Sequence, residues 1–245
     1  MRTCLFCNND ANSKEHVLSK RLARRMGILT EDITTASLAE SSGFQARNPY
    51  PLVAFETRRV CTVCNNGWMN ELEGYMETTF ASLLEAHWPP CGEVQIHNPE
   101  LLLRWMAKTA CIVQESGLLE KVIINTDRMP EVPTLEVTEG IHLYAGFIRE
   151  QNLDVRLEKG FRTWEHGILH PNREHKNGYS FVIQMNHIVL RLLIAPTAVP
   201  IFVMPYLPDR ETIPIPISAG STIQYSQGHE YNTMSDFYSS IEIQI

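Results

Sequence analysis

Long hydrophobic segments are missing from this chain of 245 residues. No apolar run approaches the roughly 18 residues that a membrane-spanning helix needs. The first residues lack the basic, apolar and small-residue order typical of a signal peptide, so we expect a cytoplasmic protein without a membrane partner. Internal repeats and low-complexity segments are missing too. Hydrophobic residues make up 44% and charged residues 20% of the chain. This composition is typical of a globular protein with one large domain or two modest ones.

Cysteine is scarce, but its spacing is informative. Four of the six cysteines form two C-x-x-C pairs, Cys4–Cys7 and Cys61–Cys64. In a reducing compartment this spacing indicates a metal more often than a disulfide, and four thiolates form the full ligand set of a structural Zn²⁺ ion. A thioredoxin-like redox pair would need one such motif at a strand-to-helix junction, whereas this chain has two. We predict that the unpaired Cys91 and Cys111 are core residues.

Several common catalytic signatures are absent. The sequence has no P-loop and no G-x-S-x-G motif. No pair of histidines forms the H-E-x-x-H motif of zinc proteases. This applies to the six histidines of the C-terminal half: His142, His166, His170, His175, His187 and His229.

The net charge of −7 is unevenly distributed. Residues 1–70 hold nine Lys and Arg against six Asp and Glu, and the remainder holds twelve against twenty-two. A phosphate backbone responds to local positive density, so the basic cluster near the start indicates nucleic-acid binding. The alternative is an ordinary solvated helix face. The cluster consists of Lys14, Lys20, Arg21, Arg24, Arg25, Arg58 and Arg59.

Periodicity predicts helices in the first half of the chain. Apolar residues from Glu15 onward recur at helical intervals as far as the stop signal Gly27. Residues 28–56 have no clear period and are predicted to be an irregular insertion, followed by a strand over 53–60. A long amphipathic helix should begin at the second cysteine pair, bury Trp68 in the core, and end at Pro89-Pro90. Another should run from Pro99, capped by Asn98, to Gly117.

Strands are predicted for the second half, behind the two helices. Alternation and turn residues, among them Met185-Asn186, favour an antiparallel sheet of five or six strands. A Pro-rich covering loop or edge is expected over 205–216. The predicted strands span 141–148, 153–158, 179–185, 187–195, 200–204 and 222–226.

Three polar residues near the cysteine pairs are candidates for chemistry. A neutral imidazole such as that of His16 can take a proton from water near pH 7. Carboxylate and amide oxygens, as in Glu15 and Asn65, suit a hard divalent cation. Because adjacent side chains of an extended segment point to opposite faces, Glu15 and His16 can serve one site only at a bend or strand end.

The motifs Cys4-x-x-Cys7, Glu15-His16-Val17 and Cys61-x-x-Cys64-Asn65 resemble those of HNH, or His-Me finger, endonucleases. Asn directly after the last zinc cysteine is similar to the arrangement in phage endonuclease VII. The strings from Lys14 to Leu18 and from Arg59 to Glu73 resemble uncharacterised bacterial and phage HNH proteins. The helix around Arg104–Ala110 resembles them more faintly.

The resemblance over residues 1–75, together with the predicted helices and strands of the remaining chain, indicates an α+β protein with two domains. Residues 1–75 would form a zinc-bound ββα-metal, treble-clef-like module. A long helix would join it to residues 76–245, which would hold a helix pair and an antiparallel sheet.

The resemblance also implies a role for each candidate residue. His16 would be the general base, and Glu15 and Asn65 would bind a catalytic Mg²⁺ or Mn²⁺ ion, with Asn66 as the alternative to Asn65. Glu56 stands where the family has its middle Asn, which orients the base. The expected activity is hydrolysis of phosphodiester bonds in nucleic acid, and DNA is favoured over RNA as the substrate. The alternative is a zinc module that binds nucleic acid or a protein partner without cutting.

Overall fold

The computed structural model of the chain is an α+β fold. It describes residues 2–27, 32–39, 43–46, 50–51, 56–85, 87–116, 124–138, 140–159, 163–165, 168–170, 178–194, 201–203 and 214–244.

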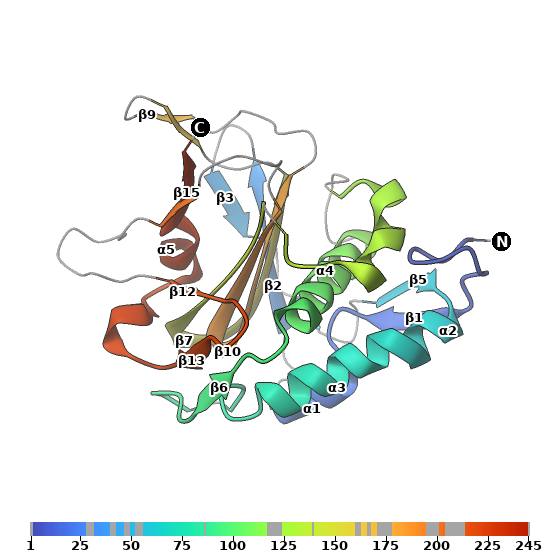
Figure 1. The fold of residues 1–245 in the computed structure, drawn as a ribbon, viewed down its shortest axis with the longest axis horizontal. Helices are drawn as coiled ribbons and strands as arrows, with labels where there is room; N and C mark the ends of the chain where they lie inside the picture. The colour runs from blue at the N-terminus through green and yellow to red at the C-terminus, as the bar shows by residue number, and fades with distance from the viewer. Residues whose placement is uncertain are drawn as a thin grey trace.

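A two-stranded antiparallel sheet and the helices around it form the N-terminal part, at the right and along the bottom of Figure 1. The second strand leads directly into the helices that carry the second cysteine pair, and α1 lies against α3. These elements are β1 (Ser13–His16), α1 (Lys20–Arg25), β5 (Glu56–Val60), α2 (Thr62–Cys64), the π-helical turn η2 (Asn65–Met69) and α3 (Asn70–Thr79).

The largest sheet is mixed and is built on a long antiparallel pair, β7 and β10. Strands β2 and β14 run parallel to β7, and β3 and β4 pair with β2. Its strands are β2 (Asp32–Ala39), β3 (Gly43–Ala46), β4 (Tyr50–Pro51), β7 (Ile141–Lys159), β10 (Tyr179–Ile194), β12 (Ile215–Pro216) and β14 (Glu230–Tyr231).

Two smaller sheets and several short helices complete the described fold. One sheet joins β11 (Ile201–Val203), β15 (Ile241–Gln244), β8 (Thr163–Glu165) and β9 (Ile168–His170), and the other pairs β6 (Glu93–Gln95) with β13 (Thr222–Gln224). The remaining helices are α4 (Pro99–Glu115), the 3-10 helices η3 (Thr126–Thr134) and η4 (Gln227–His229), and α5 (Met234–Ser239).

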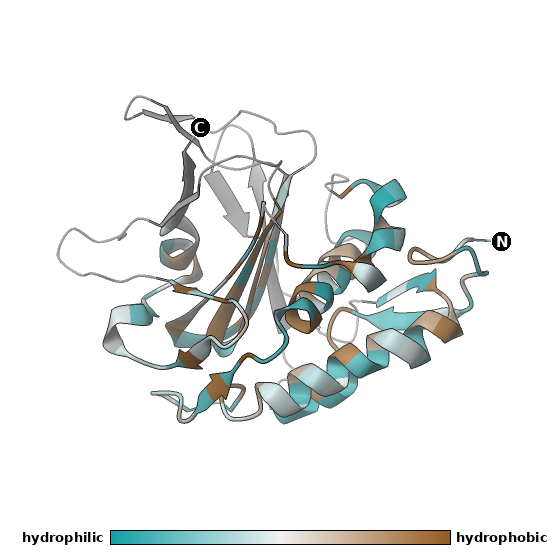
Figure 2. Ribbon diagram, in the orientation of Figure 1, coloured by the Kyte–Doolittle hydropathy of each residue, from teal (hydrophilic) through white to brown (hydrophobic). Residues whose placement is uncertain are grey.

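Helix α4 is the centre of the packing. It lies between the large sheet and the N-terminal elements, while α5 covers the other side of the sheet (Figure 1). Hydrophobic residues gather on β7, β10 and the inner faces of α4 (Figure 2). Every described side chain of β10 except its last is buried, as expected for a strand covered on both faces. One contiguous buried cluster extends from Cys4 and Phe6 through α4 to the sheet.

Several sequence predictions are confirmed. Asn98 caps α4 by accepting from the Leu101 amide, as predicted. Gly27 follows α1 with a positive φ of 75°. Cys111 is buried and Trp68 packs against the core. No helix among the described residues is long and apolar enough to cross a bilayer.

Other predictions are wrong. The segment at Glu15 is a strand, and α1 starts only at Lys20. Strands β2 to β4 occupy much of the predicted irregular insertion. The long helix is broken at Gly67, whose φ and ψ are not helical, and α3 ends at Thr79 rather than near Pro89. Cys91 is exposed. Gly117 and residues 52–55, 195, 200 and 204–213 lie outside the described residues.

The large sheet also differs from its prediction. The two predicted strands over 141–158 form the single strand β7, and those over 179–195 form β10. Asn186 has a positive φ of 55° and sits at an irregularity of the pairing, so it is not a chain reversal. The parallel pairing of β2 and β14 makes this sheet mixed rather than antiparallel.

Candidate functional site

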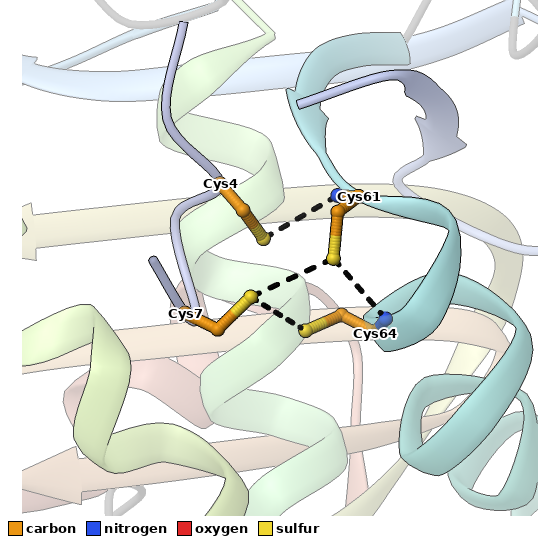
Figure 3. A group of neighbouring side chains, drawn as sticks. All are labelled: Cys4, Cys7, Cys61 and Cys64. Atoms are coloured by element: carbon orange, nitrogen blue, oxygen red, sulfur yellow. Dashed lines mark hydrogen bonds between the residues drawn. The ribbon is translucent and has the colours of Figure 1, made fainter. Parts of the chain in front are cut away.

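The four paired cysteines converge on one point, as Figure 3 shows. Their Sγ atoms all lie within 4.8 Å of one another. Cys7 Sγ is 3.6 Å from both Cys61 Sγ and Cys64 Sγ, and all four residues are free thiols. Four sulfurs at the Zn–S bond length around a tetrahedral ion are about 3.8 Å apart. The cluster therefore fits a metal such as zinc, as the spacing predicts.

Local structure holds the cysteines in place. Cys4 and Cys7 lie on a tight loop that is tied to β5 by the bond from the Leu5 amide to the Arg59 carbonyl. Cys61 and Cys64 flank the first helical turn after β5. Backbone amides of Cys61 and Cys64 point to the sulfurs of Cys4 and Cys61, at 3.3 and 3.4 Å. Such N–H donors stabilise thiolates.

The thiol of Cys61 is prepared for ionisation. Burial raises its pKa, but the Cys64 amide and the neighbouring thiols outweigh burial and lower the pKa to about 7. Burial raises the pKa of Cys4 and Cys64 above the ordinary thiol value, so Cys61 ionises before them. The charge of a metal ion would be needed to deprotonate these two sulfurs. Among the described residues, only these four cysteines form a group of three or more His, Cys, Asp or Glu side chains that could hold a metal.

His16 is the last residue of β1 and pairs with Glu56 of β5. It thus occupies the strand end that the sequence argument requires. Burial, and after it the charge of Lys20, lowers the pKa of His16, and Lys14 acts in the same direction. Glu56 opposes them. His16 is therefore a neutral imidazole at pH 7, which is the form of a general base.

Asn65 connects the helix that follows the cysteines to β1. Its Nδ2 donates to the Lys14 carbonyl at 2.9 Å and to Ser13 Oγ at 2.5 Å. The amide therefore contacts β1 two residues before His16. Asn66, the alternative to Asn65, is exposed.

Glu15 is not on the same face as His16. The two residues are consecutive in the register of β1 and β5, so their side chains point to opposite faces. Glu15 is buried, and its Oε1 lies 3.4 Å from Lys108 Nζ on α4. Burial raises the pKa of Glu15, and Lys108 opposes this. A carboxylate has two oxygens, so the contact with Lys108 occupies only part of its capacity for ligands.

The predicted basic cluster is largely exposed. Lys14, Lys20, Arg24, Arg25 and Arg58 have exposed side chains. Lys14 pairs with Glu56 at 2.8 Å.

Two arginines of the cluster are engaged elsewhere. Arg21 pairs with Glu77 of α3. The Nη1 atom of Arg59 lies 3.3 Å from Glu115 Oε2 of α4, and Arg59 is only partly exposed. Arg59 therefore joins β5 to α4, and its prediction as a phosphate contact receives no support from this placement.

The sequence reasoning missed the partners of Glu15. Lys108 is fully buried and lies between Glu15 and Glu73, and Trp105 Nε1 donates to Glu73 Oε1 at 2.9 Å. A signal was available: Lys108 follows Trp105 by three residues, so the two side chains are neighbours on the surface of the predicted helix. A buried lysine requires a carboxylate partner.

Comparisons of the chain with protein-family models, with curated proteins and with solved structures found no match. A functional proposal therefore depends on the geometry of the site and on the motifs.

Proposed function

We propose that this protein is a zinc-stabilised HNH-type endonuclease that hydrolyses phosphodiester bonds of nucleic acid, DNA before RNA. The observation that carries the proposal is the position of His16. It ends a strand of a two-stranded sheet whose second strand runs into the cysteine-held helix, and Asn65 of that helix binds the first strand. This order of strand, strand and helix supports the assignment of residues 1–75 to a ββα-metal module.

The residues around His16 suit attack of water on a phosphate. The neutral imidazole would take the proton of the attacking water. Lys14 and Lys20 lie close enough to act on the charge of His16, so a phosphate at this position would meet positive charge. The exposed Arg24, Arg25 and Arg58 would supply further positive charge for a phosphate backbone.

Asn65 remains a proposed ligand of a catalytic Mg²⁺ or Mn²⁺ ion beside His16, whereas Glu15 faces α4 from the opposite side of β1 and is not proposed as a ligand. Such an ion would stabilise the charge that develops on the phosphate and on the leaving oxygen. The amide nitrogen of Asn65 is held against β1, and the carbonyl oxygen of the same side chain is the atom that would bind the ion. The four cysteines form a separate site whose sulfur ligands suit Zn²⁺ and not these hard cations.

The test is cleavage of plasmid, single-stranded and branched DNA with Mg²⁺ or Mn²⁺. We expect His16→Ala to cleave about 100-fold to 10,000-fold more slowly than the wild type, which is the usual effect of losing a general base. His97→Ala is the matched control, because His97 is exposed and lies outside the module. Equal cleavage by wild type and His16→Ala, or none by either on every substrate, contradicts the proposal.

A specific observation favours a second candidate, a zinc module that binds without cutting. Glu56 stands where the family has an amide, pairs with His16 across the sheet, and is itself bound by Lys14. A carboxylate there repels a phosphate. Binding of DNA by both wild type and His16→Ala, weakened by salt and without turnover, would favour this function.

A further inference from the structure

Lys108 links three elements that are distant in sequence. Its Nζ lies 2.5 Å from Glu73 Oε1 on α3 and 3.4 Å from Glu15 Oε1 on β1, and its side chain is 0% exposed. Burial lowers the pKa of Lys108, but the two carboxylates outweigh burial and hold the pKa above its ordinary value. The group therefore remains a charged ammonium inside the core.

Stability alone is a poor reason for this cluster. Taking charges out of water is costly, and well-packed apolar residues often replace a buried ion pair without loss of stability. A better attested use of a buried polar contact is to fix the register of one element on another. Here the contact between Lys108 and Glu15 can fix the register of β1.

Strand β1 is held by β5 and by hydrogen bonds from the Asn65 side chain, and on the face toward α4 by the contact of Glu15 with Lys108. It has only four residues, and its pairing with β5 shifts between Ser13 and Glu15. A slip of one residue in such a strand exchanges its two faces. Glu15 would then leave Lys108, and His16 would enter the position that faces α4.

We infer that Lys108 is a positioning residue that holds β1 in register through Glu15 and thereby keeps His16 on the outer face. The catalytic consequence rests on the proposed endonuclease function, whereas the structural consequence does not. Glu73 and Trp105 complete the arrangement, because the bond from the Trp105 indole fixes the carboxylate that anchors Lys108.

The experiment compares three variants of the full chain. Lys108→Met removes the ammonium, and Lys108→Met with Glu73→Gln also removes a carboxylate that would otherwise stay buried without its cation. Glu115→Gln is the matched control, because it weakens another ion pair between the β1–β5 sheet and α4, the pair of Glu115 with Arg59. Amide hydrogen exchange of β1 and β5, and kcat and KM for DNA, are measured well below the unfolding temperature.

We expect both Lys108 variants to exchange the β1 amides at least about tenfold faster than Glu115→Gln does. We also expect kcat per folded molecule to fall about 100-fold with KM nearly unchanged, because a displaced base affects the reaction more than binding. Exchange of β1 as slow as in the control would overturn the inference, and so would an unchanged kcat in an active protein. If the wild type does not cleave, the proposed function fails and the exchange rates alone decide the inference.

Discussion

At the scale of single residues, burial and three nearby charged side chains set the proton affinity of His16. Burial lowers its pKa most, Lys20 and Lys14 lower it further, and Glu56 raises it. The net effect is a folded-state pKa below the ordinary value of 6.5. The neutral imidazole therefore stabilises the folded protein above pH 6.5, and this contribution is lost as the pH falls through the folded-state pKa.

Two substitutions should move the pKa of His16 in opposite directions. Glu56→Gln removes the carboxylate that raises it and releases Lys14, so the pKa should fall. Lys20→Met removes a positive charge, so the pKa should rise. Each change should be about 0.2 to 0.5 pH unit, because water and salt screen partly exposed charges. An NMR titration of the His16 ring measures both, and shifts of the same sign would contradict this account.

The residues of the site differ in how far the sequence could predict them. The cysteine cluster follows from spacing alone, since two C-x-x-C pairs supply a complete ligand set. The different roles of Arg58 and Arg59 do not follow from the sequence. Which of the two arginines is exposed depends on which face of β5 meets α4. The place of Glu15 could not be predicted either, since its partner Lys108 is 93 residues away in the chain.

At the scale of elements, local signals predicted helix ends better than strand partners. Asn98 and Gly27 mark their helix ends because capping is a contact within a few residues. Strand β2 was not predicted because it pairs with β7, a parallel strand more than a hundred residues later in the chain. The segment at Glu15 is a strand because β5 pairs with it, although its apolar spacing favours a helix.

Two glycines test how backbone conformation after a helix and inside a helix affects stability. Gly27 has a positive φ after α1, whereas Gly74 lies inside α3, and a Cβ atom at either position meets open space. Gly27→Ala should lower the free energy of unfolding by about 1 kcal/mol, since an L-residue is strained there. Gly74→Ala should raise it by about 0.5 to 1 kcal/mol through helix propensity. Urea unfolding measures both, and changes of equal sign would refute the assignment of these backbone conformations.

At the scale of the whole molecule, the predicted domains share one buried cluster. The buried side chain of Asn186 adds a polar connection between them. Its Nδ2 donates to the Met26 carbonyl after α1 at 3.1 Å and to the Leu84 carbonyl after α3 at 2.6 Å. The site therefore lies on elements that are packed and bonded to the large sheet. Such contacts between distant segments leave no local pattern in a sequence.

Disruption of the four-cysteine site, which could hold a metal, should consequently weaken the whole protein and not the first 75 residues alone. Phe6, between the first two cysteines, packs edge-on against Trp68 at 5.2 Å, and both adjoin the cluster that includes α4. Cys64→Ser, or a strong chelator, should lower the free energy of unfolding by more than about 3 kcal/mol in a single transition, because metal binding contributes directly to folding. Thermal unfolding with a parallel zinc assay measures this. Cys91→Ser is the control, since Cys91 is exposed and outside the cluster. Two separate transitions, or equal effects of the two serine variants, would show that the metal supports only its own loop.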